Sequence, residues 1–450
     1  MTDKLLLTTD HEREAAGKEL HALIQRLYPL FRSKTGNGVR ETLRIVDEVA
    51  GLEMFEVPSG EPAYDWTVPK EWNATEAWVK DPSGRRVIDI RDSNLHLLGY
   101  SIPVHRKMPL SELKSHLASL PDHPDWIPFR DTFYREDWGF AMRHRDLEAL
   151  PEGEYEVCIR SSLEDGHLTY GEIFLPGETT DEVLISTHTC HPSLCNDNLS
   201  GIAVATLLAR RLRNIRHRLS YRFVFVPGTI GSIVWLSQNE HKLPRIKHGL
   251  VLACVGDPGK FTYVQSRSGG VQIDRAFAHV LEHSQKEYEI RPFKPEGYDQ
   301  RQYCSPGINL PVGSLMRTPY NEFPEYHTSA DDLSFVTPDA LAGTIDMILS
   351  GLFVLENDHA YMNLSPKGEP HLGRRGLYGQ ACKLGLWWLL NLSDGQHSLL
   401  DIAERSGVAF EKLKQGADEL VRVGLLERIE NHGMTAKRHS FPTVVAQNGI

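Results

Sequence analysis

From about residue 172 onward the chain alternates short apolar runs with amphipathic segments, and this rhythm strongly constrains its fold. The apolar runs are typical of buried strands and lie at 182–188, 221–227, 248–256 and 311–316. The amphipathic segments have helical spacing and lie at 199–213, 231–240, 271–285 and 337–357. Buried strands that alternate with helices predict an α/β fold with a mostly parallel, mixed sheet flanked by helices.

The remainder of the 450 residues has two other textures, so more than one domain is expected. Helical spacing at 11–34 continues the α/β pattern toward the N-terminus, which assigns residues 1–60 and 171–365 to one domain. Strand-like runs around an Asp-Pro-Ser-Gly turn predict an inserted α+β domain over 61–170. Two helices joined by a tight Ser-Gly turn, followed by a short strand, predict a winged helix-turn-helix domain over 370–450.

Charge and apolar content argue against nucleic-acid and membrane partners. The formal net charge is −11, and residues 371–450 hold ten Lys and Arg against eight Asp and Glu. A protein that binds phosphates needs clustered basic residues, so packing within the chain or in a homo-oligomer is favoured over DNA binding. No stretch approaches the apolar length of a membrane helix, and no signal-like segment begins the chain, which predicts a cytoplasmic protein.

The six cysteines include no Cys-x-x-Cys pair and are expected to be free thiols.

Polar residues with metal-binding chemistry follow the predicted strands. His188 ends the run 182–188, Asp197 precedes the next helix, and Asp257 follows the run 248–256. His327 lies in the carboxylate-rich segment "NEFPEYHTSADDL". Ligand sites in open α/β sheets lie beyond the carboxyl ends of strands, and imidazole with carboxylate suits zinc. These four residues are therefore the predicted metal ligands.

The order of these motifs resembles a known group. A strand-end His, then Asp-Asn-x-Ser-Gly, a strand-end Asp and Tyr-His-Thr-x-x-Asp is similar to the co-catalytic zinc aminopeptidases, a group that also contains the glutaminyl cyclases. The resemblance implies that His188 and Asp257 serve one metal position and His327 the other, with Asp197 between them. The whole pattern resembles a narrower family, aminopeptidase-like proteins of uncertain function with an inserted α+β domain and a C-terminal winged helix. Members of that family are thought to act on modified carbohydrates or specialised metabolites.

Two departures from the group's pattern change the expected chemistry. Cys190 stands where the group has the Asp of His-x-Asp, and Thr229-Ile230 stands where it has Glu-Glu. One metal ligand and the general base are thereby missing, so one zinc ion per chain is expected. Glu325 is the candidate replacement for the base: in an extended loop it points to the same side as His327, two residues later. The alternative is that Glu325 is a surface acid.

Further residues are candidates for substrate binding. Arg317 follows the run 311–316 and would clamp a carboxylate or phosphate; its alternative role is an ion pair with Glu322 or Asp331. His191 would contact metal or substrate unless it is an ordinary loop histidine. The last candidates, which would line the cleft, are Asp299, Arg301 and Tyr303.

Two functions follow from these residues. The favoured function is a metal-dependent hydrolase that cuts an amide bond, peptide or N-acyl, in a small substrate such as a short peptide, a carbohydrate or a biosynthetic intermediate. The alternative is a non-catalytic or regulatory metal-binding protein that has lost its base and works through its winged helix on protein or nucleic acid.

Overall fold

The computed structural model describes residues 5–381 and 383–429. The chain divides into two compact units, residues 1–356 and the segment that begins at Asn357, and each is described separately.

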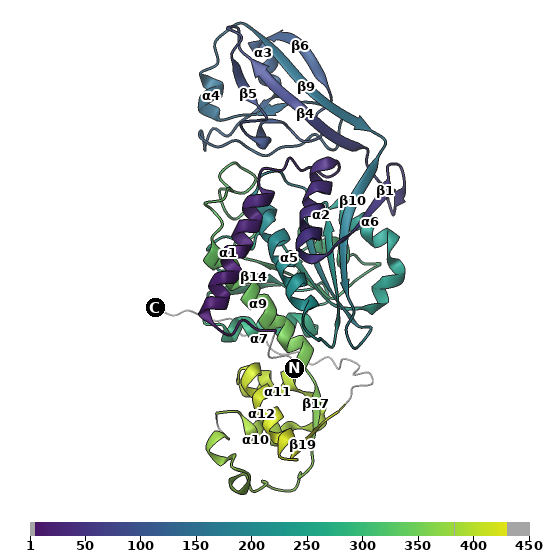
Figure 1. The fold of residues 1–450 in the computed structure, drawn as a ribbon, viewed down its shortest axis with the longest axis vertical. Coiled ribbons are helices and arrows are strands. Elements are labelled where there is room, and N and C mark those ends of the chain that lie inside the picture. The colour runs from purple at the N-terminus through teal and green to yellow at the C-terminus, as the bar shows by residue number, and fades with distance from the viewer. Residues whose placement is uncertain (1–4, 382, 430–450) are drawn as a thin grey trace. The chain divides into compact units, whose positions relative to one another are not determined.

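The first unit is built around an eight-stranded mixed sheet (Figure 1). In spatial order its strands are β1 (Glu53–Pro58), β10 (His167–Leu175), β12 (Ser220–Val226), β11 (Glu182–His188), β13 (Ile246–Leu252), β16 (Val312–Met316), β14 (Phe261–Val264) and β15 (Tyr288–Arg291). The four central strands, from β12 to β16, run parallel. At the two ends of this group, β12 pairs antiparallel with β10, and β16 pairs antiparallel with β14. The predicted α/β fold with a mixed, helix-flanked sheet is confirmed.

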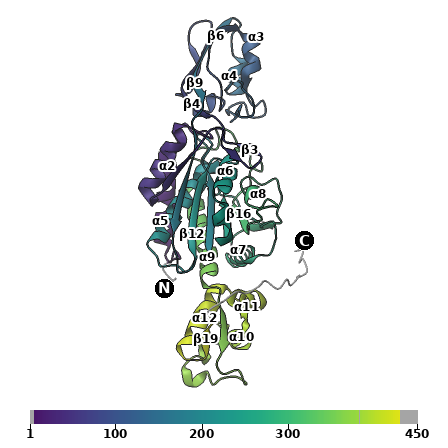
Figure 2. The same ribbon diagram turned by 90° about the vertical axis from the view of Figure 1, so that its right-hand side faces the viewer.

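Helices cover both faces of this sheet (Figure 2). On one face lie α1 (Asp10–Leu27), α2 (Asn37–Ala50) and α5 (Ser200–Arg213), and on the other α6 (Ile230–Gln238) and α8 (Gln300–Tyr303). The unit also contains α7 (Gln272–His283) and α9 (Pro338–Asn357). Contrary to the sequence expectation, α9 is long and apolar enough to span a membrane, but 72% of its apolar window is buried inside the protein.

A second sheet of the same unit is formed by residues between β1 and β10. Its order is β5 (Arg86–Asp89), β4 (Glu71–Lys80), β9 (Glu154–Glu164) and β6 (Val104–Pro109), all antiparallel, with its own apolar core. Short elements complete this region: β2 (Pro62–Ala63), β3 (Trp66–Thr67), α3 (Leu110–Leu113), β7 (Leu117–Ala118), β8 (Phe140–Ala141) and α4 (His144–Glu148). In the described chain, no strand of this sheet pairs with the eight-stranded sheet. The predicted boundaries at 61 and 170 stay predictions.

The second unit is a winged helix, as predicted, although its first strand lies before the predicted boundary at 370, and residues 430–450 of the predicted domain lie outside the described chain. Its helices are α10 (Leu386–Leu392), α11 (Leu399–Ser406) and α12 (Phe410–Arg422), and its strands are β17 (Ala360–Asn363), β18 (Asp394–Ser398) and β19 (Leu426–Arg428). Ser398 and Asp401 form a capping box at the start of α11, and Gly407 ends that helix with a positive φ of 65°.

Two elements are shorter than the sequence pattern predicts. The helix expected over 11–34 ends at Leu27, because Pro29 has no N–H to continue the helical ladder. The strand expected over 248–256 ends at Leu252, since Cys254 has a φ of 51° and turns the chain. This early turn lets the backbone N–H groups of residues 254–257 donate hydrogen bonds to side chains at the start of α5 and just before it.

Candidate metal centre

His188 is placed by β11, which runs between β12 and β13. His188 pairs with Val226 at the last position of the parallel β11–β12 ladder, and the side chain of His188 is 2% exposed. The chain leaves β11 toward β12 through α5, then crosses to β13 on the other side of β11 through α6. His188 therefore lies at the point where the strand order reverses, which is where open α/β sheets form ligand sites.

Asp197 is held at the start of α5 by backbone contacts. The N–H groups of Asn196 and Asp197 donate to the two oxygens of Asp331, at 2.6 and 2.9 Å. The side chain of Asn196 accepts from the N–H groups of Gly256 and Asp257, at 2.8 and 3.2 Å. Because all of these groups are buried, the carboxylate of Asp197 is fixed in position from both sides.

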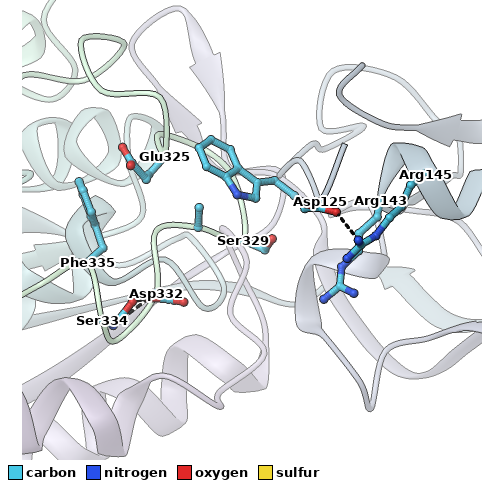
Figure 3. Close-up of a pocket in the computed structure, with 10 residues that line it drawn as sticks. Asp125, Arg143, Arg145, Glu325, Ser329, Asp332, Ser334 and Phe335 are labelled. Carbon is cyan, nitrogen blue, oxygen red and sulfur yellow. Dashed lines mark hydrogen bonds and ion pairs between the residues drawn. The ribbon is translucent and has the colours of Figure 1, made fainter. Parts of the chain in front are cut away.

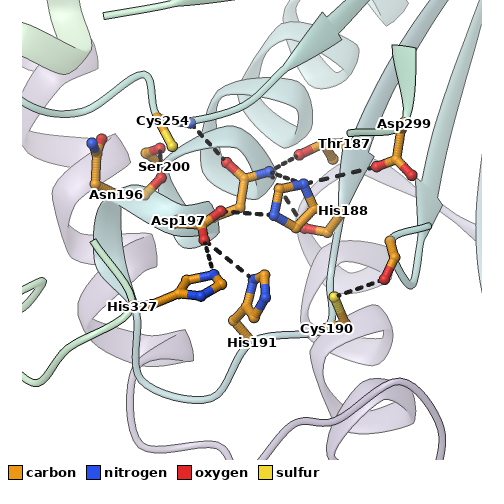
Figure 4. Close-up of polar contacts among 12 residues, drawn as sticks. Thr187, His188, Cys190, His191, Asn196, Asp197, Ser200, Cys254, Asp299 and His327 are labelled. Carbon is orange, nitrogen blue, oxygen red and sulfur yellow. Dashed lines mark hydrogen bonds and ion pairs between the residues drawn. The ribbon is translucent and has the colours of Figure 1, made fainter. Parts of the chain in front are cut away.

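Three histidines surround the carboxylate of Asp197 (Figure 4). His188 Nε2 lies 2.9 Å from Oδ1, His327 Nε2 lies 3.0 Å from Oδ2, and His191 Nδ1 lies 3.6 Å from Oδ2. The ligand atoms of His188, His191 and Asp197 all lie within 4.8 Å of one another. The structure thus brings together three of the four predicted ligands and adds His191, which the sequence left open between metal, substrate and an ordinary loop position.

Several polar atoms of this cluster lack hydrogen-bond partners. Among the described residues, His191 Nδ1, Asp197 Oδ2 and His327 Nε2 are buried without one; His327 lies close to Asp197 but not at a hydrogen-bond angle. Leaving a polar atom buried and unpaired costs about 1–3 kcal/mol. Three such atoms that converge are satisfied together by one cation, so the residues fit a metal ion. Zinc is the ion that this His and carboxylate set favours.

The ionisation of the cluster also suits a cation. Burial lowers the pKa of His191 well below its usual value, which keeps the imidazole neutral. Burial alone would raise the pKa of Asp197, but His191, His188 and His327 together hold it well below its usual value. A neutral imidazole and an ionised carboxylate are the forms that bind a metal.

Asp299 lies on the other side of the His188 ring (Figure 4). Its Oδ2 is 3.8 Å from His188 Nδ1, and its Oδ1 accepts from the hydroxyl of Ser232 at 2.9 Å. Burial lowers the pKa of His188, but the hydrogen bond and charge of Asp197 and the charge of Asp299 raise it overall. At 3.8 Å, the approach of Asp299 to His188 is a contact between charges and not a hydrogen bond, and Asp299 Oδ2 is itself buried without a hydrogen-bond partner among the described residues. The polar atom nearer to the back of the ring is Asn198 Nδ2, 3.3 Å from His188 Nδ1.

Asp257 is not part of the cluster. Its Oδ1 accepts from Thr318 Oγ1 and the Gly259 N–H, at 2.6 and 2.8 Å, and its Oδ2 accepts from Asn196 Nδ2 and the Thr318 N–H, at 3.0 and 3.1 Å. Both oxygens are therefore taken up by the protein. Asp257 supports the loop of Asn196 and does not take the ligand role that the resemblance implies.

Arg317 takes neither of the roles expected from the sequence. Its guanidinium donates to the carbonyls of Gly259 and Ala340, both at 2.9 Å, and lies 4.2 Å from the Phe261 ring centroid. Glu322, one of its expected partners, pairs with Arg291 instead. With the contact from Nε to Thr344 Oγ1 at 3.3 Å, three of its five N–H donors are used within the protein. Arg317 thereby ties α9 to the loop after β13.

The remaining candidates are spread over three environments. Tyr303 is fully buried and its hydroxyl lies 2.8 Å from Ser186 Oγ, so it packs against β11 from within the core. Arg301 is exposed on α8. Glu325 is half-buried, and its segment is a turn and not the expected extended loop: the Thr328 N–H donates to the Glu325 carbonyl at 3.0 Å, and His327 has a φ of 56°. The strand-like alternation that was expected to point Glu325 and His327 to one side is therefore absent. Burial raises the pKa of the Cys190 thiol to about 12, which keeps the residue at the altered His-x-Asp position protonated.

Several residues of the centre escaped the sequence analysis. Phe129, from the region of the second sheet, contacts the rings of His191 and His327 at 4.9 and 5.1 Å, and nothing local in the sequence indicates this. Arg32, which is buried after α1, donates to the carbonyl of His191 at 3.0 Å. Asp331 was visible as the last residue of Tyr-His-Thr-x-x-Asp, but its role in holding the Asp197 loop needed the structure.

Comparison with known proteins defines the class of the fold first. A zinc aminopeptidase from Bacillus subtilis matches with a TM-score of 0.56 at 14% identity, over 75% of this chain and 95% of the other. This likeness concerns the fold alone, and it confirms the predicted resemblance to the zinc aminopeptidases.

The chain belongs to the family described as a domain of unknown function (DUF4910), whose model matches residues 21–358, and a winged helix-turn-helix model matches residues 359–428. A Clostridium acetobutylicum protein is 48% identical over 92% of this chain and 97% of its own length. It is described as a candidate polysaccharide biosynthesis protein with an aminopeptidase-like domain. A crystal structure of a candidate peptidase from Clostridium acetobutylicum matches with a TM-score of 0.91 at 48% identity, over 93% of this chain and 98% of the other.

Proposed function

We propose that this protein is a zinc-dependent hydrolase that cleaves an amide bond in a small substrate, such as an N-acyl or aminoacyl intermediate of polysaccharide biosynthesis. The observation that carries the proposal is the convergence of His191 Nδ1, Asp197 Oδ2 and His327 Nε2, buried and without hydrogen-bond partners, beside His188. The aminopeptidase-like fold supports hydrolysis, and the description of the Clostridium relative supports a carbohydrate-linked substrate.

One zinc ion per chain is the proposed content. Zinc would be held by three side chains of the set His188, His191, Asp197 and His327, since a catalytic zinc keeps one position for water or substrate, and it would supply Lewis-acid activation of a carbonyl and of water. The position of the missing Glu-Glu favours a single ion, because Thr229 and Ile230 offer no carboxylate there.

The protein's own residues would complete the reaction. Glu325 stands two residues before His327, and in the described chain its carboxylate has no ion pair. It would take a proton from the attacking water and pass it to the leaving amine. Phe129 would shield the histidines from bulk water, and the negative charge of Asp299 would support a metal-bound His188.

The first experiment is metal analysis of the purified protein, combined with a mass-spectrometric screen of N-acyl and aminoacyl compounds. We expect about one zinc per chain and turnover of at least one amide. Two tightly bound zinc ions would contradict the single site. Zinc-loaded protein that cleaves no amide would overturn the hydrolase and favour the non-catalytic, regulatory alternative.

Substitution of Glu325 tests the mechanism. Glu325→Gln keeps size but removes the basic carboxylate, so turnover should fall about 10²–10⁴-fold while zinc content holds. Glu322→Gln is the matched control, since this exposed acid of the same loop pairs with Arg291 and should leave turnover nearly unchanged. Near-normal activity of the Glu325 variant would place the base elsewhere.

A further inference from the structure

A hollow of about 540 Å³ is lined in part by the loop that carries His327, and of its lining residues only Glu325 takes part in the mechanism above (Figure 3). One wall comes from the region of the second sheet and includes Asp125, Trp126 and Arg143. The opposite wall is the loop that carries His327 and includes Glu325 and Asp332. Two regions far apart in the sequence therefore form one binding surface.

The two walls are joined by backbone pairing that continues into the metal centre. Pro128 and Thr328 form an antiparallel bridge, the Phe129 N–H donates to the His327 carbonyl at 2.7 Å, and the Ser329 N–H donates to the Ile127 carbonyl at 2.8 Å. Trp126 in the hollow and Phe129 at the histidines are three residues apart along this segment. Three residues span at most about 10 Å of chain, so the hollow and the metal centre are linked by one short segment.

The lining of the hollow combines an aromatic ring with polar groups. The indole of Trp126 is stacked on the ring of His123, with centroids 4.2 Å apart and an angle of 4° between the planes. A rigid aromatic surface packs against the C–H face of a sugar ring. The carboxylates of Glu325 and Asp332 and the hydroxyl of Ser329 line the same hollow and are acceptors for sugar hydroxyls.

One cation of the hollow is available to an anion. Arg145 is paired with Asp125 at 2.8 Å, whereas Arg143 is exposed and has no ion pair within the described part of the chain. A guanidinium has a planar fork that matches a carboxylate or phosphate. Because the other walls carry the carboxylates of Asp125, Glu325 and Asp332, Arg143 is the position in the hollow where an anion would bind.

We propose that this hollow binds the non-reacting part of the substrate and that this part is an anionic sugar, with its ring on Trp126 and its carboxylate or phosphate on Arg143. The proposal deepens the proposed function and rests on it, because it names the class of compound whose amide would reach the metal centre. Binding in the hollow itself does not require turnover, so the two can fail separately.

The test is a ligand-observed NMR titration of the full-length, zinc-loaded protein with glucuronate, glucose 6-phosphate and glucose. At least one anionic sugar should bind about tenfold more tightly than glucose, and Arg143→Gln should remove that difference. Comparison of the two anions identifies carboxylate or phosphate as the recognised group. Arg85→Gln is the control, because this exposed arginine of the same region pairs with Asp81 away from the hollow and should change nothing.

Two further variants separate the hollow from the metal centre. Trp126→Leu should weaken all three sugars, and Asp197→Asn should leave their binding intact. The proposal is overturned if no anionic preference exists, if Arg143→Gln retains it, or if Asp197→Asn abolishes binding, which would place the sugar on the metal. Melting curves of each variant confirm that the titrations concern folded protein.

Discussion

The two ends of β11 both bury charged residues, but they do so in opposite ways. Glu182 begins the strand in a network in which Arg222 donates to Glu182 at 2.6 and 3.0 Å and also pairs with Glu172. Glu172 further accepts from Trp235 Nε1 at 3.0 Å and pairs with Lys242 at 3.2 Å. None of the charged atoms in this network is left unpaired among the described residues.

At the other end of the strand, roughly 20 Å away, His188 begins a cluster that does not close on itself. His191, Asp197 and His327 each keep a buried polar atom without a hydrogen bond. Buried polar groups are almost always paired, so the first end of β11 is an element of the architecture and the second is prepared for a ligand. The comparison shows that unsatisfied atoms which converge, rather than buried charge as such, mark the functional end of the sheet.

The largest expected effect follows from Asp197→Asn. The amide cannot supply the negative charge shared by three histidines, so zinc should fall from about one per chain to a small fraction of that, and amide hydrolysis should fall to background. Metal analysis and activity on the same preparation measure both. Retention of zinc would contradict the ligand role.

Arg222→Met should have the reverse profile. Removal of one partner from a closed buried network leaves Glu172 and Glu182 uncompensated, which costs about 3–5 kcal/mol of unfolding free energy. Zinc per folded chain should not change. Arg216→Met, which breaks an exposed pair with Glu178, is the control and should cost less than about 1 kcal/mol in the same urea unfolding experiment. Equal losses would show that the network is not what stabilises this end.

Asp299→Asn should produce a smaller change, confined to the metal end. The variant loses the negative charge 3.8 Å from His188 Nδ1, and if this charge supports a metal-bound His188, zinc affinity should fall about 10–100-fold in competition with a chelator. Arg301→Gln, exposed two residues later on α8, is the matched variant and should keep wild-type affinity. An unchanged affinity for the Asp299 variant would make its contact with His188 incidental.

The smallest effect concerns His248 on β13, whose Nδ1 is also buried without a partner but stands outside any cluster. Burial, helped by the positive charges of Arg218 and Lys247, lowers its pKa to about 3. The unfolded chain binds this proton below its ordinary pKa of about 6.5 and the folded protein does not, so stability falls as pH falls from 6.5 toward 3.

For His248 this loss should be about 1 kcal/mol between pH 7 and 5.5. Urea unfolding at the two pH values in an Asp197→Asn background removes any contribution from the metal, and His248→Leu should flatten the dependence. A slope that persists in the variant would assign the proton uptake to another group. The result would also show that a solitary unpaired atom affects stability without forming a site.

The local pattern of apolar and polar residues in the sequence determined many of the helices and strands of this protein. The run 182–188 coincides with β11, so the sequence placed His188 at the end of that strand and Asp197 just before α5. Both could be predicted because burial on both faces of a sheet and helical periodicity are visible in a few consecutive residues. The same holds for the capping box that begins α11 and for the winged-helix assignment.

Only the tertiary structure decided which of the predicted residues meet. Asp257 and Arg317 lie near the expected strand ends, but Thr318, Gly259 and Ala340 offer hydrogen bonds that the sequence does not announce, and these take up both side chains. His191 joins the cluster beside Phe129, a residue of the loop between β7 and β8. The reason is physical: a side chain's local sequence sets where its backbone lies, whereas its partners are set by contacts between segments up to hundreds of residues apart.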